Sequence, residues 1–256
     1  SFLIYLDTMK VFSSSVFKTI RIISFGGEGF HKKPLKRLYD AFHHRTRFIN
    51  VYGPTEGTCI CSSYEITDND FEKLDSIPPI GRINQNFDYL IIDDDSMSDH
   101  GELCLLGPNV GLGYYNDDEK TRKKFIENPF NKRYSEIMYK TGDLVEEKNG
   151  LLFFIGRVDN QIKHMGYRIE LEEIEFALNS ISEVNQAAVV YKKTSELYGK
   201  IVAFVALDTD LSKVEIMKKL QDLIPEYMIP HIFKELDQLP KNQNGKIDKQ
   251  ELLKVL

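Results

Sequence analysis

The stretch 156–170 separates two parts of the chain that both read as ordinary core elements. It holds five fixed charges and two glycines in fifteen residues that otherwise have the pattern of a strand. Residues 151–155 before it form an apolar run typical of a buried strand, and after it apolar residues recur at helical spacing from Leu171 to Ile181. Exposed backbone, small residues and charges that can exchange partners are what a conformational joint needs. We therefore expect a hinge that borders an active site, although the run alone would better suit a surface-exposed edge strand with solvated charges.

Length and composition fit a soluble globular protein with two domains. The chain has 256 residues, and domains commonly hold about 100–150. Its net charge of −6 argues against nucleic acid or an anionic membrane as the main partner. No apolar stretch approaches the roughly 20 residues that span a bilayer, and we expect no leader sequence and no membrane insertion. The cysteines form no C-x-x-C pair and the histidines are scattered, so we expect a reducing, cytoplasmic setting without structural zinc.

The first part, residues 1–80, alternates strand and helix, which favours an α/β layer. Its predicted elements are a strand at 21–25, a glycine-rich loop at 26–29, a helix that opens at Pro34, and a strand at 48–52 that runs into the turn 53–57. Ligands of α/β sheets bind where loops leave the carboxyl ends of strands, so we expect both loops to face one crevice. The chain starts inside a segment with Leu3, Leu6 and Met9 at helical spacing, as expected for a cut through a larger protein.

From about residue 81 to residue 157 the pattern changes to short strands with turn residues between them, which indicates a small twisted or barrel-like β subdomain. The predicted strands are 89–92, 102–106, 138–140 and 151–155. One helix at 121–126 interrupts them, with Asn116 and Glu119 spaced as a capping box.

After the charged run we expect a compact α+β lid domain, residues 158–256, attached through a hinge at 158–160. Its predicted elements are a helix at 171–180, strands at 186–191 and 201–207, a helix at 213–223, a bend at 225–230, a strand at 233–236, a loop at 240–246 and a short helix from Asp248.

Three short segments carry groups suited to a nucleotide. The first segment runs from Asn50 to Glu56, at the end of the strand 48–52 and in the turn after it. There Tyr52 could stack a purine, Thr55 could bond a phosphate oxygen and Glu56 could hold Mg²⁺. A carboxylate in the position of Asp143 commonly holds a ribose, and Lys246, beside a glycine, could stabilise charge that develops in a transition state. Each segment alone is more often a simple turn or a solvated loop. Much stronger evidence is that five motifs, which include these three segments, occur together and in this order: YGPTE, GELCLLG, YKTGDL, GRVDNQIKHMGYRIE and NGKID.

These motifs resemble the carboxyl-terminal half of the adenylate-forming enzymes, a superfamily of acyl-CoA synthetases, peptide-synthetase adenylation domains and luciferases. Residues 169–175 and 225–230 are most similar to D-alanine–D-alanyl carrier protein ligases and amino-acid adenylation domains. The resemblance covers essentially the whole chain. It implies that Mg-ATP activates a carboxylate to an acyl-adenylate with release of pyrophosphate. A thiol, either a carrier-protein phosphopantetheine arm or free CoA, then takes the acyl group.

The resemblance also implies roles for individual residues. The implied nucleotide-binding residues are Gly27, Glu28, Asn50, Val51, Tyr52, Gly53, Pro54, Thr55, Asp143, Phe154, Ile155, Gly156, Arg157 and Lys246. Within this set Tyr52 lies against adenine, Asp143 and its partner Arg157 hold the ribose, and Thr55 and Lys246 are catalytic. The implied acyl-substrate residues are Gly27, Cys59 and Lys246. Glu56 is the implied magnesium ligand, Asp159 the hinge about which the small domain turns, and Gly166 the part of the thiolation face that approaches pantetheine.

Two departures from the family pattern shape the expected function. The phosphate loop and the amino-group-binding aspartate of the family belong to a region upstream of this sequence, so we expect this chain alone to be inactive. The D-alanine ligases carry a cysteine in the loop that matches residues 25–28, where this chain has glycine, which predicts a substrate larger than D-alanine. Two alternatives stay open: a non-catalytic carrier-protein-binding module with a vestigial nucleotide cleft, and an acyl-CoA synthetase that uses free CoA.

Overall fold

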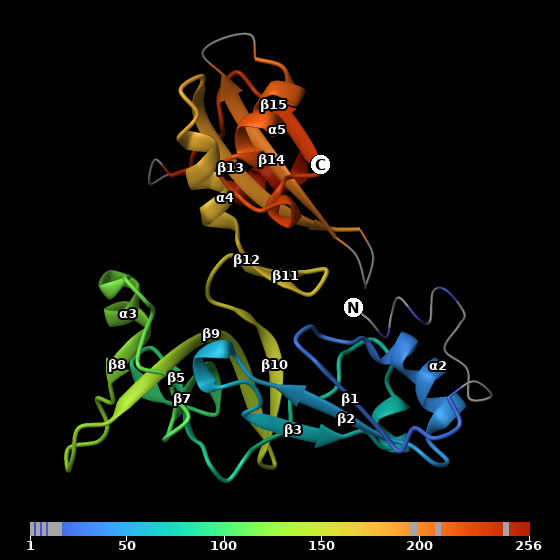
Figure 1. Cartoon of the computed structure of the whole chain (residues 1–256). Coiled ribbons are helices and arrows are strands. Elements are labelled where there is room, and N and C mark those ends of the chain that lie inside the picture. Colours follow the sequence, from blue (N-terminus) through green and yellow to red (C-terminus); the bar gives the residue numbers. More distant parts are fainter. Residues whose placement is uncertain are drawn as a thin grey trace. The chain divides into compact units, whose positions relative to one another are not determined.

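The computed structural model describes residues 17–194, 199–207, 211–242 and 246–256, together with Leu3, Leu6 and Met9. The helix expected at the start of the chain and loop residues 243–245 therefore lie largely or wholly outside the described residues. The chain consists of two compact units, Ser1–Asp159 and Asn160–Leu256 (Figure 1). Among the described helices, none combines the length and the apolar character needed to cross a bilayer.

The first unit begins with a mixed four-stranded sheet in the order β1-β2-β3-β4. Its strands are β1 (Ile22–Gly26), β2 (Arg47–Tyr52), β3 (Ser62–Glu65) and β4 (Arg82–Ile83), of which β1 and β2 are parallel. Helix α2 (Lys32–Phe42) connects β1 to β2 (Figure 1). Its Leu35 and Leu38 are buried in one cluster with Ile23 and Phe48 of these strands. The helix begins two residues before its predicted start at Pro34. Proline fits inside the first turn because an N–H there has no partner within the helix.

A second, antiparallel sheet completes the first unit, in the order β10-β9-β7-β5-β6 with β8 paired to β9. Its strands are β5 (Asp88–Asp93), β6 (Ser96–Met97), β7 (His100–Leu106), β8 (Phe125–Glu127), β9 (Ile137–Lys148) and β10 (Leu151–Arg157). Leu103, Leu105 and Tyr139 are fully buried in its core, and Tyr52 of the first sheet belongs to the same cluster. The predicted β-rich region is thus confirmed, and its core is shared with the end of β2.

The strand predicted at 138–140 is longer than expected. It does not end before Thr141-Gly142-Asp143, the T-G-D motif, because β9 continues through this motif to Lys148. The pairing of β7 with β9 shifts there, from Glu102↔Leu144 to Cys104↔Lys140, so the motif forms a bulge instead.

The short helix of this sheet also differs from its prediction. Helix α3 spans Asp118–Lys124, and its N-cap is Asp117, whose Oδ1 accepts a hydrogen bond from the Lys120 amide at 2.9 Å. The expected cap, Asn116, lies in the preceding turn with φ +54°. Phe125 leaves the helix and starts β8, because its ring is buried 4.9 Å from the ring of Tyr139. Tertiary packing therefore decided where this helix ends.

The charged run 156–170 includes the end of β10, in the first unit, and a β-hairpin of the second unit. Its strands β11 (Gln161–His164) and β12 (Tyr167–Glu170) pair antiparallel. Met165 and Gly166 connect them with φ of +53° and +88°. Two consecutive residues with positive φ form the hairpin turn that best matches strand twist, and glycine at the second of them makes it favourable.

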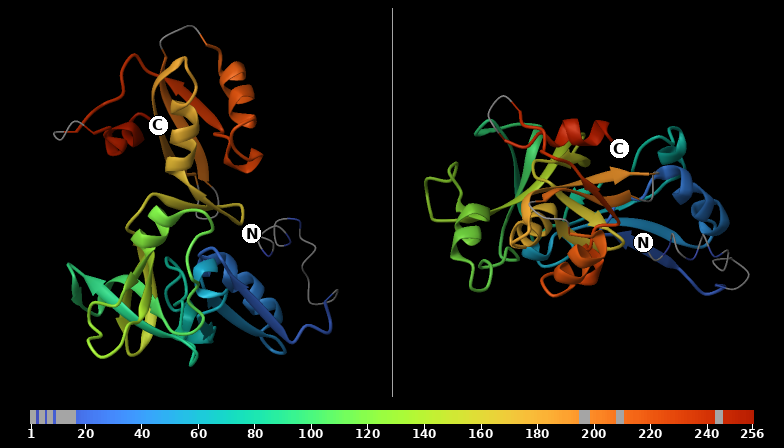
Figure 2. Two further views of the ribbon diagram at one scale, coloured as in Figure 1. Left: turned by 60° about the vertical axis from the view of Figure 1, so that its left-hand side comes forward. Right: turned by 90° about the horizontal axis from the view of Figure 1, so that it is seen from above.

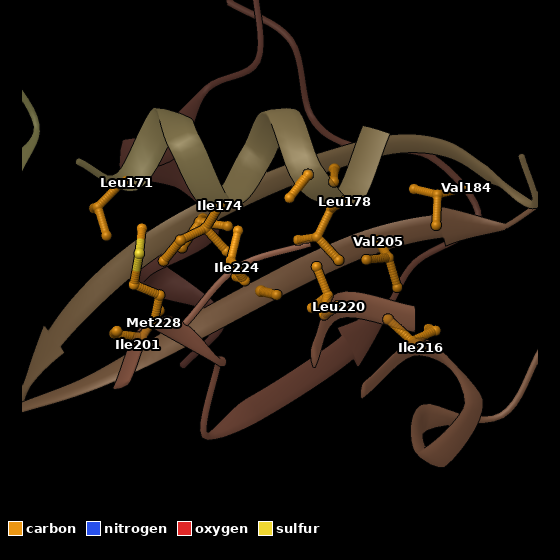
Figure 3. Packing of buried hydrophobic residues seen from close by; sticks show 14 of the residues in the cluster. Leu171, Ile174, Leu178, Val184, Ile201, Val205, Ile216, Leu220, Ile224 and Met228 are labelled. Atoms are coloured by element: carbon orange, nitrogen blue, oxygen red, sulfur yellow. The ribbon is translucent and has the colours of Figure 1, made fainter. Parts of the chain in front are cut away.

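The rest of the second unit is a three-stranded sheet, β13-β14-β15, covered on both faces. Its elements are α4 (Leu171–Asn179), β13 (Val184–Lys193), β14 (Gly199–Leu207), α5 (Lys213–Gln221), β15 (Ile232–Glu235) and α6 (Lys249–Lys254). Figure 3 shows Ile174 and Leu178 of α4 pointing toward the strands, in a cluster that also holds Ile201 and Val205. The alternate residues Val190 and Phe204 pack with α6, which lies across the sheet from α5 (Figure 2).

This module agrees closely with the predicted α+β domain. Each predicted helix and strand is present with ends shifted by one or two residues, and the bend near Pro225 contains the 3₁₀ turn Glu226–Met228. The mixed α/β fold class predicted for the whole chain is confirmed.

Candidate functional site

The parallel strands β1 and β2 end side by side, and both loops singled out in the sequence leave from there. Gly26, the last residue of β1, pairs with Val51 in β2. The loop that begins at Gly27 and the turn that begins at Gly53 therefore leave the same edge of the sheet, as predicted. Thr55 lies exposed in the second of these loops. This edge is where ligands bind in sheets of this kind.

Asn50 fixes β2 to the segment that precedes β4. The residue is 8% exposed, and its Nδ2 donates a hydrogen bond to the carbonyl oxygen of Pro79 at 2.7 Å. Because one amide hydrogen is already used inside the fold, a nucleotide contact from Asn50 can use only its second N–H or its Oδ1.

A buried network joins the end of β2 to the paired strands β9 and β10. The Tyr52 hydroxyl donates to Asp143 Oδ2 at 2.5 Å, and Arg157 Nη1 donates to Asp143 Oδ1 at 2.5 Å. Tyr52 is 7% exposed and Asp143 3% exposed. Burial, and next the Asp143 charge, raise the pKa of Tyr52 well above its ordinary value, so the phenol stays protonated and keeps donating. Charge-assisted hydrogen bonds of this kind are short and strong, and they fix the position of the Asp143 carboxylate.

Asp159 holds the other side of the Arg157 guanidinium. Arg157 Nε donates to Asp159 Oδ1 at 2.6 Å and Nη2 donates to Oδ2 at 2.8 Å, which is a two-pronged pair. Burial lowers the pKa of Arg157, but Asp159 and Asp143 outweigh it and raise that pKa overall. Lys124 of α3 lies 3.5 Å from Asp159 Oδ2. The predicted hinge residue is thus tied, through one arginine, to the predicted ribose residue.

The bulge in β9 leaves room for this guanidinium. Gly142 has φ +76°, and a Cβ on it would lie 2.7 Å from both Arg157 Nη2 and Asp159 Oδ2. A larger residue would collide with the ion pair and would also be strained at this backbone angle. The glycine of the T-G-D motif is therefore explained by the side chains that pack over it.

Glu56 contacts a residue that the sequence did not single out. The Tyr114 hydroxyl donates to Glu56 Oε1 at 2.6 Å, and the Gly111 amide donates to the Glu56 carbonyl oxygen at 2.7 Å. Burial, with the bond to Glu56, raises the pKa of Tyr114. Thr58 Oγ1 also donates to the carbonyl oxygen of Asn109 at 2.7 Å. The loop after β7 is thereby fastened onto the turn after β2.

The described residues contain no group of three or more His, Cys, Asp or Glu side chains that could hold a metal ion by themselves. The predicted Mg²⁺ does not require such a group, because proteins usually bind this ion through one or two carboxylates together with substrate phosphates. Glu56, the predicted ligand, supplies a half-buried carboxylate that the Tyr114 hydroxyl holds in place.

The other predicted residues of the first unit lie on or near these elements. Glu28 and Phe154 are half-buried, while Cys59 and Ile155 are exposed. The pairing of β9 with β10 shifts between Phe154 and Gly156, so Ile155 lies in a second bulge. Val51 and Pro54 are half-buried on either side of Tyr52 and Gly53.

Lys246 and Gly166 belong to the second unit. Lys246 is exposed; its amide donates to Asn242 Oδ1 at 3.1 Å, and the Asn242 amide donates to the Lys246 carbonyl oxygen at 2.7 Å. Gly166 is exposed at the tip of the β11–β12 hairpin. Both roles stay predictions.

Two family models match the chain. Residues 4–115 match the model described as AMP-binding enzyme, and residues 173–246 match the model of the AMP-binding enzyme C-terminal domain. The chain belongs to the AMP-binding enzyme family. The resemblance to adenylate-forming enzymes that the sequence motifs indicated is thereby confirmed.

Relatives in this family are much longer than the chain. Bacitracin synthase 1 from Bacillus licheniformis is 38% identical over 240 residues, which cover 91% of this chain and 4% of that protein. The D-alanine--D-alanyl carrier protein ligase of Bacillus cytotoxicus is 36% identical over 252 residues, covering 94% of this chain and 49% of the ligase. The structure of the Vibrio cholerae adenylation domain AlmE in complex with glycyl-adenosine-5'-phosphate matches this chain with a TM-score of 0.81 at 26% identity. The match covers 98% of this chain and 47% of the AlmE chain. The chain thus spans at most about half the length of these relatives.

Sequence reasoning identified the charged and aromatic groups of this candidate site but missed three residues around them. Tyr114 follows the GELCLLG motif in a glycine-rich loop, so an aromatic residue at that position was an available signal. Lys124 and Thr141 gave no signal, because a helix-end lysine and a strand threonine are common. Thr141 Oγ1 donates to the Leu103 carbonyl oxygen at 2.7 Å and accepts from the Asp143 amide at 3.0 Å.

Removal of the Tyr52 hydroxyl is expected to weaken both stability and nucleotide binding. In Tyr52→Phe, Asp143 loses a hydrogen bond in a buried setting, which costs about 1.5–3 kcal/mol for a bond to a charged group. Tyr64→Phe is the matched control, because the Tyr64 hydroxyl also donates to a carboxylate of the first unit, that of Asp70 at 3.0 Å, away from this edge. Urea unfolding and calorimetric ATP binding of the whole protein measure the two effects. Equal loss of ATP affinity in both variants would contradict a specific role for Tyr52.

Proposed function

We propose that the chain is part of an ATP-dependent carboxylate ligase that activates an amino acid as its acyl-adenylate and then transfers it to a phosphopantetheine thiol. The observation that carries this proposal is the buried Tyr52–Asp143–Arg157 network at the carboxyl end of β2. It presents a fixed carboxylate beside a turn with an exposed hydroxyl, in a chain of the AMP-binding family. The family relatives that are ligases or adenylation domains support the same reaction.

Each residue of this edge has a proposed task in binding ATP. Asp143 accepts hydrogen bonds from the ribose hydroxyls, and Arg157 holds its carboxylate in place. Thr55 donates its hydroxyl to the α-phosphate. Tyr52 lies against the adenine. Because Tyr52 is only 7% exposed, the adenine can contact only a small part of this side chain. Mg²⁺, held by Glu56 and the phosphates, would offset the negative charge of the leaving pyrophosphate.

The first reaction makes a mixed anhydride. A carboxylate oxygen of the substrate attacks the α-phosphorus of ATP, the bond from that phosphorus to the bridging oxygen breaks, and pyrophosphate leaves with the electron pair. Negative charge builds between two anions in this step, so a cation such as Lys246 stabilises the transition state more than the ground state. In the second reaction the thiol sulfur attacks the acyl carbon and AMP leaves.

We propose that the small unit turns about Asp159 between these two reactions, so that Lys246 withdraws and the Gly166 hairpin comes forward. The division of the chain into compact units between Asp159 and Asn160 supports a joint at this point. The ion pairs of Asp159 with Arg157 and Lys124 support a joint that can hold one state. We place the domain boundary, as in the sequence, at 158–160.

The substrate and acceptor are proposed from features of the first unit and from the relatives. At Gly27 no described atom outside the glycine and its two chain neighbours lies within 4 Å of where a Cβ would be, which supports a pocket roomier than one for D-alanine. The ligase relative is named for its D-alanyl carrier protein, which favours a carrier-protein arm over free CoA. Transfer to a thiol also needs a reducing compartment, as in the cytoplasm.

A pyrophosphate-exchange screen tests this function. The whole protein is incubated with ATP, Mg²⁺, labelled pyrophosphate and each of a panel of amino and other carboxylic acids, and we expect strong exchange with a side chain larger than that of alanine. Clear preference for D-alanine would contradict the pocket assignment. Absence of exchange and of ATP binding would instead favour a carrier-binding module without catalysis. A later comparison of carrier protein with CoA as acceptor decides between the two thiols.

A further inference from the structure

Glu56 is fixed at two points by the loop that follows β7. The Tyr114 hydroxyl donates to its Oε1 at 2.6 Å, and the Gly111 amide donates to its carbonyl oxygen at 2.7 Å. Glu56 and Tyr114 are both half-buried, whereas the neighbours Leu112 and Tyr115 are fully exposed. Of these loop residues, Tyr114 is the one that turns inward, and it turns inward onto the carboxylate.

Tyr114 is itself held rigidly by the helix that follows it. Its ring packs edge-on against Phe125 with centroids 5.5 Å apart, and Lys120 Nζ lies 5.0 Å from its centroid. Its backbone amide donates to Thr121 Oγ1 at 2.8 Å. Lys120 and Thr121 belong to α3 and Phe125 follows it directly, so the phenol is anchored by one short helix and the residue after it. A hydroxyl held in this way fixes one rotamer of the carboxylate that it bonds.

We propose that Tyr114 is a positioning residue that fixes the orientation of the Glu56 carboxylate for binding the Mg²⁺ of the nucleotide. The inference rests on the proposed function, since it needs a nucleotide with its metal at this edge. A carboxylate with one fixed oxygen gives up less freedom when it binds a cation than one that rotates freely. Groups that orient a metal ligand in this way typically change metal affinity by about 10–100-fold when they are removed.

The test compares Tyr114→Phe with Tyr115→Phe in the whole protein. Both variants delete one phenol oxygen from adjacent residues of the same loop, but the Tyr115 side chain is fully exposed. Calorimetry measures ATP affinity at a series of Mg²⁺ concentrations without the acyl substrate. We expect Tyr114→Phe to need about tenfold more Mg²⁺ for the same ATP affinity. Affinity for ATP in the presence of a chelator should be unchanged, and Tyr115→Phe should match the parent protein.

The possible outcomes distinguish failure of this inference from failure of the proposed function on which it rests. If saturating Mg²⁺ fails to restore ATP affinity in Tyr114→Phe, or if affinity falls equally with the chelator, then Tyr114 only supports the fold and the inference is wrong. It is also wrong if the two variants behave alike. A parent protein that binds no ATP under any condition overturns the proposed function, and the role of Tyr114 with it.

Discussion

Lys246→Ala is expected to slow acyl-adenylate formation by about 10²–10³-fold, which is the usual cost of removing one preorganised group that stabilises a developing charge. The attacking carboxylate and the α-phosphate are both anions, so the transition state concentrates negative charge that a single ammonium can offset. Lys246 is exposed in the second unit and forms no ion pair with the residues that the structure describes, so its charge is available to a substrate. Pyrophosphate exchange by the whole protein measures the rate.

Lys241→Ala provides the matched control for that measurement. Lys241 is exposed on the same segment and forms an isolated bridge with Ile247, directly after Lys246. We expect its replacement to leave exchange within about twofold, because it shares the charge but not the proposed role. A second readout starts from chemically prepared acyl-adenylate and follows transfer to the thiol, where Lys246→Ala should be close to the parent protein. Exchange that falls only a few fold in Lys246→Ala would show that this cation is not the catalytic one.

The second unit could be predicted almost completely from its sequence, because its elements are defined by local patterns. The helix that starts at Leu171 and the strands around Val190 and Phe204 carry periodic apolar residues that fill both faces of one sheet. Helix α5 starts at a capping box in which Ser212 and Glu215 bond each other's backbone amides. Such signals depend only on neighbours in the chain, so element ends were displaced by no more than a residue or two.

The first unit was harder to predict because its exceptions arise from distant contacts. Nothing near Gly142 in the sequence shows that a guanidinium fifteen positions later packs over it, so a bulge was mistaken for the end of a strand. Phe125 likewise ends α3 because its ring is buried beside Tyr139. In both places long-range packing outweighed a local propensity that favoured another conformation.

The candidate site shows the same division. Motifs named Tyr52, Asp143 and Arg157 from residue type and order, but not that the first two share a hydrogen bond across 91 positions of sequence. Nor did any local pattern show that Tyr114 reaches Glu56, 58 positions away. Sequence motifs therefore supplied the chemical groups, while their mutual positioning came only from the fold.

Arg157→Ala is expected to destabilise the first unit by about 3 kcal/mol, because it leaves the Asp143 carboxylate buried without a cation. The side chains of this pair are only 12% and 5% exposed. Arg47→Ala is the matched control: Arg47 makes a two-pronged bond, as Arg157 does with Asp159, to Glu65 at 2.8 and 2.6 Å, but at the surface with 60% and 47% exposure. Exposed pairs contribute little because water and salt screen them, so the control should unfold at nearly the parent urea concentration.

Burial of an uncompensated charge, rather than loss of contacts alone, should account for most of the Arg157→Ala effect. The Asp143→Asn/Arg157→Ala double variant separates these causes, because a neutral amide in place of the carboxylate removes the charge that lost its partner. We expect the double variant to be more stable than Arg157→Ala alone. Both variants should bind ATP poorly, because the double variant lacks the Asp143 carboxylate and the single variant lacks the arginine that holds it. If the double variant is instead less stable by the sum of the single effects, the two residues act independently. The network that links the nucleotide edge to Asp159 would then not be the unit that the geometry indicates.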